Sequence, residues 1–497
     1  MIRKIGLIAL IAAGIAGCLF EKTPEYCTGD DGDRLCDTAK HTWINGPSDS
    51  GTPQPAMCTA ATVAKDCKDP NLPVCGKDGR CAACDSNAVT PDMGVSECAA
   101  VHPALPFCSK KGTCVECLAA ADCIKAQGTC NTKTFTCDKC VENADCASGL
   151  CENSKCADPK NLIYVDSAAC ATGKGMGTYE QPYCKVQDGI DHKSAVLPKT
   201  VVVRKGTYAE NLSIDATAAT INLVLLGANG AVLQPASGGE PALKLVGDAT
   251  GINKLLATVI GFTITGATQK EAVNCVGSAA QGQTTLKLQH ATIRDNTDVA
   301  LSALSCDITI DQALIGPRND RGGVSLTASD FTITNTVITK NGAETANMNP
   351  GSDVGGISVA LLAKRAIVMN TSVVANSSKL LADASGIVCP GGNKMIVGNT
   401  VIFGNTGGKG GTQITTKNCN MDKDAFPGAM TPNIDLTTCT MDDLFMSDYH
   451  LKKGNAPCTL VDQGSNAPAS QPAPDYDLDG NHRPAGTGFD IGAYELQ

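Results

Sequence analysis

A short frame that returns along the second part of the chain restricts the fold more than any other feature. Its copies are Gly261-Phe-Thr-Ile264, His290-Ala-Thr-Ile293, Gln312-Ala-Leu-Ile315, Asn335-Thr-Val-Ile338, Asn370-Thr-Ser-Val373 and Asn399-Thr-Val-Ile402. The aligned apolar residues lie 29, 22, 23, 35 and 29 positions apart. Stacked β-coils give such spacings, because each coil needs roughly three short strands plus turns and tolerates loop insertions.

Asparagines recur at a fixed distance from this frame. Asn296, Asn341, Asn376 and Asn405 each follow an aligned apolar residue by three positions. Asparagine tolerates the left-handed turn conformation and can hydrogen-bond to copies of itself in neighbouring coils. We therefore predict a turn ladder. A β-sandwich or propeller is the alternative, but it needs regular hairpin signals that the sequence lacks.

Sixteen of the 27 cysteines lie between Cys58 and Cys156. Their spacing repeats in blocks: Cys67, Cys75, Cys81 and Cys84; Cys98, Cys108, Cys114 and Cys117; Cys123, Cys130, Cys137 and Cys140; Cys146, Cys151 and Cys156. Three C-x-x-C pairs within the blocks suit zinc in a cytosolic protein and disulfides in an exported one. Since large apolar side chains are scarce here, we expect disulfides to replace a core over residues 58–157.

The first residues indicate export. Arg3 and Lys4 precede an apolar run, Ile5 to Ala16, that spans only about 18 Å as a helix, short of a bilayer core of about 30 Å. The following Ile15-Ala-Gly-Cys18 resembles the lipobox of bacterial lipoproteins, which implies cleavage after residue 17 and acylation of Cys18. Leu19, where an Asp would resemble an inner-membrane retention signal, favours the outer membrane or cell surface. We expect residues 18–57 to form a flexible tether.

The net charge and the aromatic content limit the classes of ligand that the chain is expected to bind. A net charge of −10 argues against nucleic acid, whose phosphates would repel the chain. Aromatic residues make up only 4% of the chain, which disfavours extended stacking platforms for sugars. The expected partners are a membrane, through the lipid anchor, and polysaccharide or surface proteins.

Two further motifs lie at the start and at the end of the repeat region. Ile163-Tyr-Val-Asp166 with Val186-Gln-Asp-Gly-Ile-Asp191 opens the region, and Asp475-Tyr-Asp-Leu-Asp-Gly480 with Asp490-Ile-Gly-Ala-Tyr-Glu495 closes it. Together with the coil spacing, they resemble the pectin-lyase-like right-handed parallel β-helix superfamily over roughly residues 160–497. The resemblance implies an all-β chain: a β-helix at 160–440 and a capping element at 441–497, after the disulfide-rich, loop-rich repeats. We also expect Arg483 to pair with one of the neighbouring carboxylates.

The remaining cysteines are candidates for further disulfides. We expect Cys27 with Cys36 in the tether, Cys170 with Cys184 at the first coil, and two staples between coils: Cys275 with Cys306, and Cys389 with Cys419. Cys439 and Cys458 are also disulfide candidates.

Catalytic residues are less clear than the fold. Enzymes with this fold cleave acidic polysaccharides with a basic residue near calcium-held carboxylates or with clustered aspartates. The local candidates are Arg294, Asp295, Arg318, Asp320 and Arg321, with an arginine as base and Asp295 and Asp320 as metal ligands. His290 lies on the same stretch. A solvated polar turn explains the same residues.

A second carboxylate series lies near the end of the chain. Asp475, Asp477 and Asp479 alternate as in a calcium loop, but Gly486 occupies the twelfth position, where such loops place Glu. We therefore predict no cofactor and keep calcium as an alternative. The favoured function is non-enzymatic display or binding at the cell surface. The alternatives are a polysaccharide lyase or hydrolase, and a structural role in an envelope layer.

Overall fold

The computed structural model describes residues 36–37, 42–43, 58–59, 62–67, 69, 71–84, 98, 104–123, 128–141, 143–152, 154–168, 175–192, 198–278, 283–342, 354–361, 364–378, 385–389, 394–407, 416–417, 420–421, 436, 438–467 and 471–497. The chain divides into two units, Met1–Cys114 and Val115–Gln497. Within the described ranges, no helix has the length and apolarity to cross a membrane. Cys18, Cys27, Cys170 and Cys419 lie outside these ranges.

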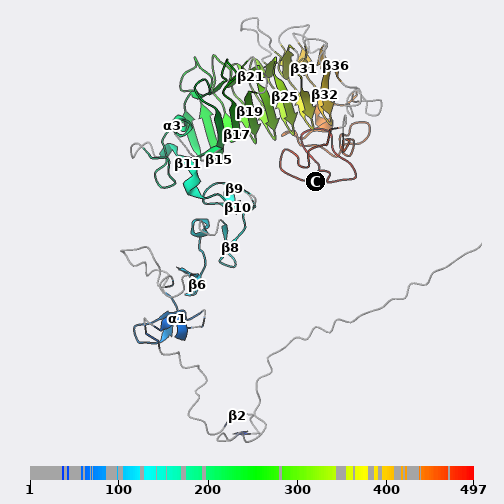
Figure 1. Cartoon of the computed structure of the whole chain (residues 1–497). Helices are drawn as coiled ribbons and strands as arrows, with labels where there is room; N and C mark the ends of the chain where they lie inside the picture. The colour runs from blue at the N-terminus through cyan, green and yellow to red at the C-terminus, as the bar shows by residue number, and fades with distance from the viewer. Residues whose placement is uncertain are drawn as a thin grey trace, which may run out of the picture. The chain divides into compact units, whose positions relative to one another are not determined.

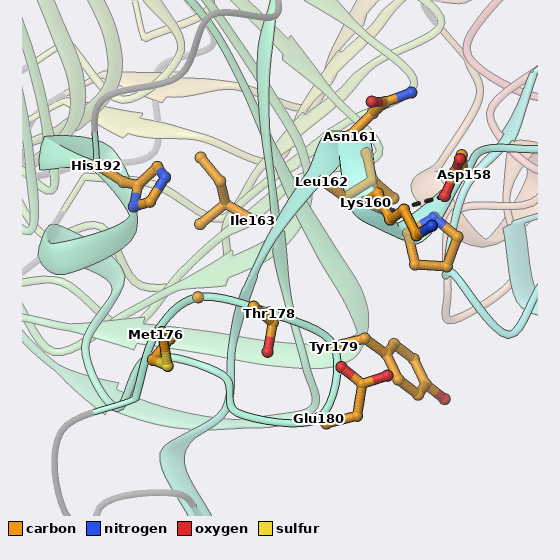
Figure 2. A pocket seen from close by; sticks show the side chains of 12 residues that line it. Asp158, Lys160, Asn161, Leu162, Ile163, Met176, Thr178, Tyr179, Glu180 and His192 are labelled. Carbon is orange, nitrogen blue, oxygen red and sulfur yellow. Dashed lines mark hydrogen bonds between the residues drawn. The ribbon is translucent and has the colours of Figure 1, made fainter.

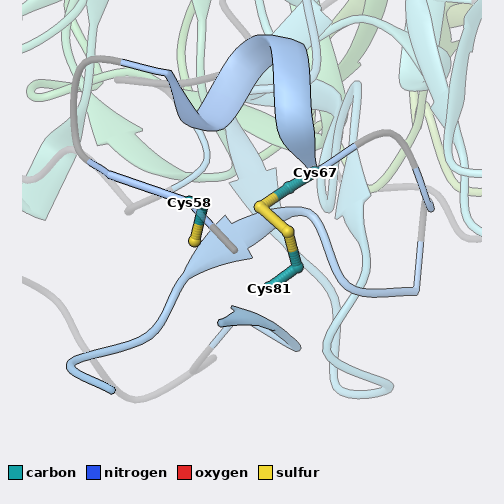
Figure 3. Close-up of side chains that lie close together, drawn as sticks. All are labelled: Cys58, Cys67 and Cys81. Carbon is teal, nitrogen blue, oxygen red and sulfur yellow. A yellow bond between two sulfur atoms is a disulfide. The ribbon is translucent and has the colours of Figure 1, made fainter. Parts of the chain in front are cut away.

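The first unit contains two disulfide modules. It includes the strand pair β1 (Cys36–Asp37) and β2 (Thr42–Trp43), the helix α1 (Val63–Asp66), and the hairpins β3 (Val74–Cys75) with β4 (Cys81–Ala82) and β5 (Phe107–Cys108) with β6 (Cys114–Val115). The disulfides are Cys58–Cys75, Cys67–Cys81, Cys84–Cys108 and Cys98–Cys114. Figure 3 shows the Cys67–Cys81 bond below α1.

The second unit opens with two more modules of the same kind. Their elements are η1 (Ala120–Cys123), β7 (Thr129–Asn131), β8 (Thr136–Asp138), η2 (Asn143–Asp145), β9 (Cys151–Glu152) and β10 (Lys155–Cys156). The disulfides are Cys117–Cys130, Cys123–Cys137, Cys140–Cys151 and Cys146–Cys156. In all four modules the first cysteine therefore bonds to the third, and the second to the fourth.

The pairing corrects the block boundaries expected from spacing. Each module begins one cysteine earlier, at Cys58, Cys84, Cys117 and Cys140. Each C-x-x-C pair therefore lies at the boundary between two modules. Its first cysteine is the last of one module, its second cysteine is the first of the next, and the two bond to different partners. The close sulfur triplets, such as Cys58, Cys67 and Cys81, all belong to disulfide-bonded cysteines.

The rest of the second unit is a right-handed parallel β-helix made of three strand stacks (Figure 1). Stack A runs β11 (Leu162–Val165), β12 (Lys199–Val203), the start of β15 (Ile221–Gln234), the start of β17 (Leu255–Ile264), β19 (Thr284–Gln289), β22 (Asp307–Asp311), β25 (Asp330–Thr334), β28 (Ala366–Met369), β32 (Lys394–Gly398) and β36 (Asn420–Met421). Every pairing in it is parallel.

Two further stacks complete each coil. Stack B runs β13 (Gly206–Ala209), the ends of β15 and β17, β20 (Thr292–Ile293), β23 (Leu314–Ile315), β26 (Val337–Thr339), β29 (Ser372–Val374) and β33 (Val401–Phe403). Stack C runs β14 (Leu212–Asp215), β16 (Leu243–Val246), β18 (Val273–Val276), β21 (Val299–Leu304), β24 (Gly322–Thr327), β27 (Ile357–Ala360), β31 (Ile387–Val388) and β35 (Thr416–Lys417). The short strands β30 (Ser377–Ser378) and β34 (Thr406–Gly407) also pair in parallel.

Alternation along the strands fills the interior with aliphatic side chains. In β22, Ile308 and Ile310 are fully buried, and the residues between them point outward. Ile308 lies beside Leu286 of β19 and Phe331 of β25, so inward positions form continuous rows through the coils. The predicted Cys275–Cys306 disulfide is confirmed, and it joins two buried residues of this core.

The first coil is closed by β11 and the helix α3 (Val186–Asp191). Val186 and Ile190 of α3 belong to the interior cluster. The fourth disulfide module is tied to the same end, because Tyr164 of β11 donates a hydrogen bond to the carbonyl of Ser148 at 3.2 Å. A 3-10 turn, η3 (Pro159–Asn161), joins the module to β11.

The recurring frame marks the corner between stacks A and B. The first residue of each copy adopts a positive φ, which lies between 44° and 49° for His290, Gln312, Asn335, Asn370 and Asn399 and is 75° for Gly261. Glycine and asparagine accept this conformation at least cost, which explains why they recur there. The frame is thus a corner motif followed by a strand of stack B.

The ladder asparagines form the next corner, between stacks B and C. Asn296, Asn341, Asn376 and Asn405 are fully buried, and the predicted side-chain ladder is present. Their own conformation differs from the expectation, since the left-handed residue is the one before each of them, Asp295, Lys340, Ala375 and Gly404. The ladder also contains Asn319, which bonds to Asn296 at 2.7 Å and to Asn341 at 2.8 Å.

The described residues of the C-terminal segment, 438–467 and 471–497, pack against the outside of stack B. The helix α4 (Met441–Leu444) and the following loops bury a second apolar cluster that includes Val337, Val374 and Val401 of stack B with Leu451 and Ile491 of this segment. Ala493 donates its backbone N–H to Ser372 Oγ at 3.1 Å. This C-terminal segment therefore covers one side of the β-helix, and the expectation that it caps the last coil stays a prediction.

Candidate functional site

Of the charged residues predicted as a catalytic cluster, Arg294, Asp295 and Arg318 come together at the corner between stacks B and C, and Arg321 forms a separate pair. Asp295 contacts the guanidinium of Arg318 from the next coil, and Arg294 Nε lies 3.7 Å from Asp295 Oδ2. Arg321 pairs with Asp298, with Nη1 3.2 Å from Oδ2. Parallel stacking brings these residues into neighbouring coils, as Asn296 and Asn319 show.

The exposure of this charged corner is uneven. The Arg318 side chain is 71% exposed, whereas that of Asp295 is 27% exposed. Burial raises the pKa of Asp320, and the nearby Arg318 partly opposes that rise. The corner therefore offers paired arginines and one carboxylate with a raised pKa, which is the type of group that general acid–base catalysis uses.

The predicted calcium residues have three different environments. The buried Asp477 carboxylate accepts backbone hydrogen bonds from Asp479, Asn481 and Glu495 at 2.7–3.0 Å. Asp479 Oδ2 lies 2.7 Å from His450 Nε2, and Asp475 offers its carbonyl to the Arg483 N–H. Asp477 therefore organises the loop of the C-terminal segment.

The described residues test one of the other cysteine predictions, Cys439 with Cys458, and leave the remaining pairs as predictions. The Cys439–Cys458 disulfide is present in the C-terminal segment. Cys184 and Cys389 are also disulfide-bonded, and their predicted partners, Cys170 and Cys419, lie outside the described residues, as does Cys27, the predicted partner of Cys36.

The outer face of stack A carries ordered polar rows that the sequence reading missed. Lys287, Thr309 and Thr332 form one row, on consecutive strands β19, β22 and β25. Gln289, Asp311 and Thr334 form a second row, and Thr285, Asp307 and Asp330 form a third. Neighbouring members of a row are spaced by about 4.8 Å, the distance between adjacent strands.

Contacts within these rows hold the carboxylates in place. Asp311 Oδ1 accepts hydrogen bonds from Thr334 Oγ1 at 2.7 Å and from Asn335 Nδ2 at 3.1 Å. Asp307 pairs with Arg365, and Asp330 accepts the backbone N–H of Arg365 at 3.1 Å. The face is therefore ordered, and it presents hydroxyl, carboxylate and ammonium groups. The alternation Asp-Ile-Thr-Ile-Asp at 307–311 was the sequence signal for its outward side.

Comparisons with known proteins give distant likenesses only. No protein-family profile matches the chain, and no curated protein matches it. Among solved structures it is similar to pectate lyase Pel9A, with a TM-score of 0.31 and 11% identity over 68% of this chain and 96% of that one.

Two pectin methylesterases also align with the chain. One, in complex with a hexasaccharide, has a TM-score of 0.28 and 14% identity over 48% of this chain and 71% of its own. The other, from carrot, has a TM-score of 0.23 and 11% identity over 52% and 88%. These alignments are weak, and the β-helix assignment rests on the parallel strand register described above.

Proposed function

We propose that this chain is an exported lipoprotein, anchored through Cys18 at the outer membrane or cell surface, whose β-helix binds polysaccharide. The support for export comes from the first eighteen residues and from the disulfides of the four modules, which persist in oxidising compartments. The modules act as a cross-linked spacer between the lipid-anchored tether and the β-helix.

The observation that carries the binding proposal is the outer face of stack A. A polysaccharide is a long ligand with regularly repeated hydroxyl groups, so it suits a surface with polar groups at regular intervals. The Lys287, Thr309 and Thr332 row supplies such groups along the helix axis. Because Asp307, Asp311 and Asp330 are already held by neighbouring groups, the face needs little reorganisation on binding.

The binding proposal is tested with a panel of polysaccharides. The full chain in detergent is applied to immobilised neutral, amino-sugar and uronate polysaccharides, and its retention is measured. We expect saturable binding to at least one class. Equal, non-saturable retention on all surfaces, or none on any, contradicts the proposal.

The anchor is tested separately by metabolic labelling with palmitate. We expect label in the wild-type chain and none in Cys18→Ala, because acylation needs that thiol. Label that persists in the variant contradicts the anchor at Cys18. A Cys27→Ala variant is the matched control, and it should keep its label.

A lyase that acts on acidic polysaccharide is the second candidate, and the grouping of Arg294, Asp295 and Arg318 favours it. Arg318 would act as the base, and Asp295, which it pairs with, and Asp320, whose pKa it lowers, would hold calcium. Ultraviolet absorbance of unsaturated products across uronate polysaccharides, with and without calcium, tests it. No product from any substrate counts against it, and loss of product in Arg318→Ala supports it.

A further inference from the structure

An outward row of stack A changes from apolar to polar along the β-helix. Its members, in the order of the strands from β11 to β25, are Tyr164, Val202, Leu226, Ile260, Gln289, Asp311 and Thr334. Their neighbours Val165, Val203 and Leu225 belong to the interior cluster, so by alternation the row points outward. The four apolar or aromatic members form a stretch that would favour association if it were exposed.

The fourth disulfide module, residues 140–156, covers the start of this row, and we call it module 4. Tyr164, Val202 and Leu226 are only 1–3% exposed, and they share a buried cluster with Leu162. Leu150 of module 4 and Ala157, directly after it, pack against this cluster. The polar members begin at Gln289, beyond these contacts. The apolar stretch therefore matches the part of the row that module 4 reaches.

Polar and backbone contacts fix module 4 on the row. The Tyr164 hydroxyl donates a buried hydrogen bond to the Ser148 carbonyl at 3.2 Å. Gly149 adopts a φ of +75°, and a Cβ on this residue would lie 3.2 Å from Cγ1 of Val202. Both the conformation and the close approach to β12 therefore favour glycine at this position. The Ala157 N–H donates to the Leu150 carbonyl at 2.9 Å, which joins the two residues that pack on the row.

The connection from module 4 to the first coil is short and ordered. Asp158 accepts the Lys160 N–H at 2.9 Å at the start of η3, and Leu162 follows as the first residue of β11 (Figure 2). The pocket shown in Figure 2 lies beside this connection, and Leu162 and Tyr179 are among its lining residues. The Tyr179 ring packs edge-on against the Tyr164 ring at 5.2 Å. Module 4, η3 and the Tyr179 loop thus all meet at β11.

The fold of module 4 depends on its disulfides. Its own buried cluster consists of Cys140, Cys146 and Cys156, with Cys151 partly buried against them. These four cysteines form the bonds Cys140–Cys151 and Cys146–Cys156. A body this small cannot hold its shape by apolar burial alone, so the cross-links replace a core. Leu150 directly precedes Cys151, and its place on the row therefore depends on these bonds.

We infer that module 4 is a redox-dependent end cap of the β-helix, and that the spacer consists of the first three modules. While both disulfides are closed, the module keeps Tyr164, Val202 and Leu226 out of water. A dithiol that reduces one of these disulfides breaks the S–S bond, leaves two thiols on the module and is itself oxidised to a disulfide. The reduced module loses its fold and uncovers the row. The inference depends neither on polysaccharide binding nor on the lipid anchor.

Amide hydrogen exchange of the full chain in detergent tests the inference. One variant replaces the four cysteines of module 4 by serine, and the matched control replaces the four cysteines of the third module, Cys117, Cys123, Cys130 and Cys137. In the module 4 variant we expect the amides of β11 and β12 to exchange about tenfold faster or more, and those of β25 to stay unchanged. The control should match the wild type. Unchanged exchange in the module 4 variant, or an equal rise in both variants, overturns the inference.

A second pair of variants separates the contact from the disulfides. Leu150→Asp keeps every cysteine and places a charge against the apolar row. Val141→Asp places the same charge in module 4 at a side chain that is 93% exposed, and it is the matched control. We expect faster exchange of β11 and β12 in Leu150→Asp and wild-type exchange in Val141→Asp. If the two variants exchange alike, module 4 does not protect the first coils through this contact, and the end cap is wrong.

Discussion

Asn319 Nδ2 donates a hydrogen bond to Oδ1 of Asn341 in the next coil at 2.8 Å, and both side chains are fully buried. The same nitrogen donates to the Ile293 carbonyl at 3.0 Å, and Asn319 Oδ1 accepts from Asn296 at 2.7 Å. One amide therefore satisfies groups on both neighbouring coils. Because the ladder is closed to solvent, each broken bond leaves a buried polar group unpaired.

Replacing Asn319 should destabilise the β-helix. Asn319→Ala removes the acceptor of Asn296 and the donor to Asn341, and each unsatisfied buried group costs about 1–3 kcal/mol. We expect the free energy of unfolding in urea to fall by about 2–4 kcal/mol. Asn455→Ala, at an exposed asparagine, is the control, and a similar loss there would show that the ladder is not the cause.

A buried ion pair holds the loops of the C-terminal segment together. Arg483 Nη1 lies 2.7 Å from Glu495 Oε2, and neither side chain is exposed. Arg483→Met leaves Glu495 buried without its cation, which costs about 3–5 kcal/mol. We expect amides of residues 475–496 to exchange with solvent faster, while those of stack C remain protected. Adding Glu495→Gln should recover part of the loss, and no recovery would argue against an effect of the unpaired charge.

The C-terminal segment also has a pH-dependent contact. Burial lowers the pKa of His450, but hydrogen bonds and charge from Asp479 and Asp448 raise it more, so its net pKa is raised. A raised pKa in the folded state gives stability that is fully present below the unfolded value of about 6.5 and is lost as pH rises through the folded pKa.

Thermal unfolding at a series of pH values measures this contribution. The wild-type midpoint should fall on raising the pH from about 6.5 through the raised pKa of His450, and His450→Gln should reduce that slope. His482→Gln is the control, because its ring packs against Tyr476 at 4.3 Å and contacts no carboxylate among the described residues. An unchanged slope in His450→Gln would exclude His450 as the titrating group.

The disulfide pattern predicts a specific peptide map. Proteolysis without reduction should yield the Cys117–Cys130 and Cys123–Cys137 cross-links. A Cys114–Cys117 bond, or bound zinc at this C-x-x-C pair, would contradict the module boundaries. Removing one module disulfide, as in Cys117→Ser with Cys130→Ser, should cost about 2–5 kcal/mol because little apolar core replaces it.

The repeat spacing predicted the coils and most of the ladder, yet it missed Asn319. Asn296 follows Ile293 by three positions, but Asn319 follows Ile315 by four, because Gly316, Pro317 and Arg318 form a corner that is one residue longer. A ladder asparagine can therefore follow the aligned apolar residue by either three or four positions. Arg318 was predicted as a catalytic residue because it lies close to Asp320 and Arg321 in the sequence, whereas the residue between Arg318 and Asp320, Asn319, is buried and structural.

The spacing of the repeats also could not predict where the C-terminal segment packs. Val337, Val374 and Val401 are buried on the outer side of stack B, so those strands show continuous burial instead of alternation. Continuous apolar runs such as Val401-Ile-Phe403 indicate a strand covered on both faces. Which segment supplies the cover depends on long-range contacts such as Ser372 with Ala493, which no local pattern encodes.

The most direct test of the account compares two faces of the same β-helix. Thr309→Arg with Thr332→Arg places bulky charges in the central row of stack A, and Ser325→Arg with Ser358→Arg places them on neighbouring strands of stack C. Both double variants should unfold at similar temperatures. We predict that retention on the polysaccharide bound by the wild type is lost in the stack A variant and kept in the stack C variant. Equal retention by both variants would contradict binding at stack A.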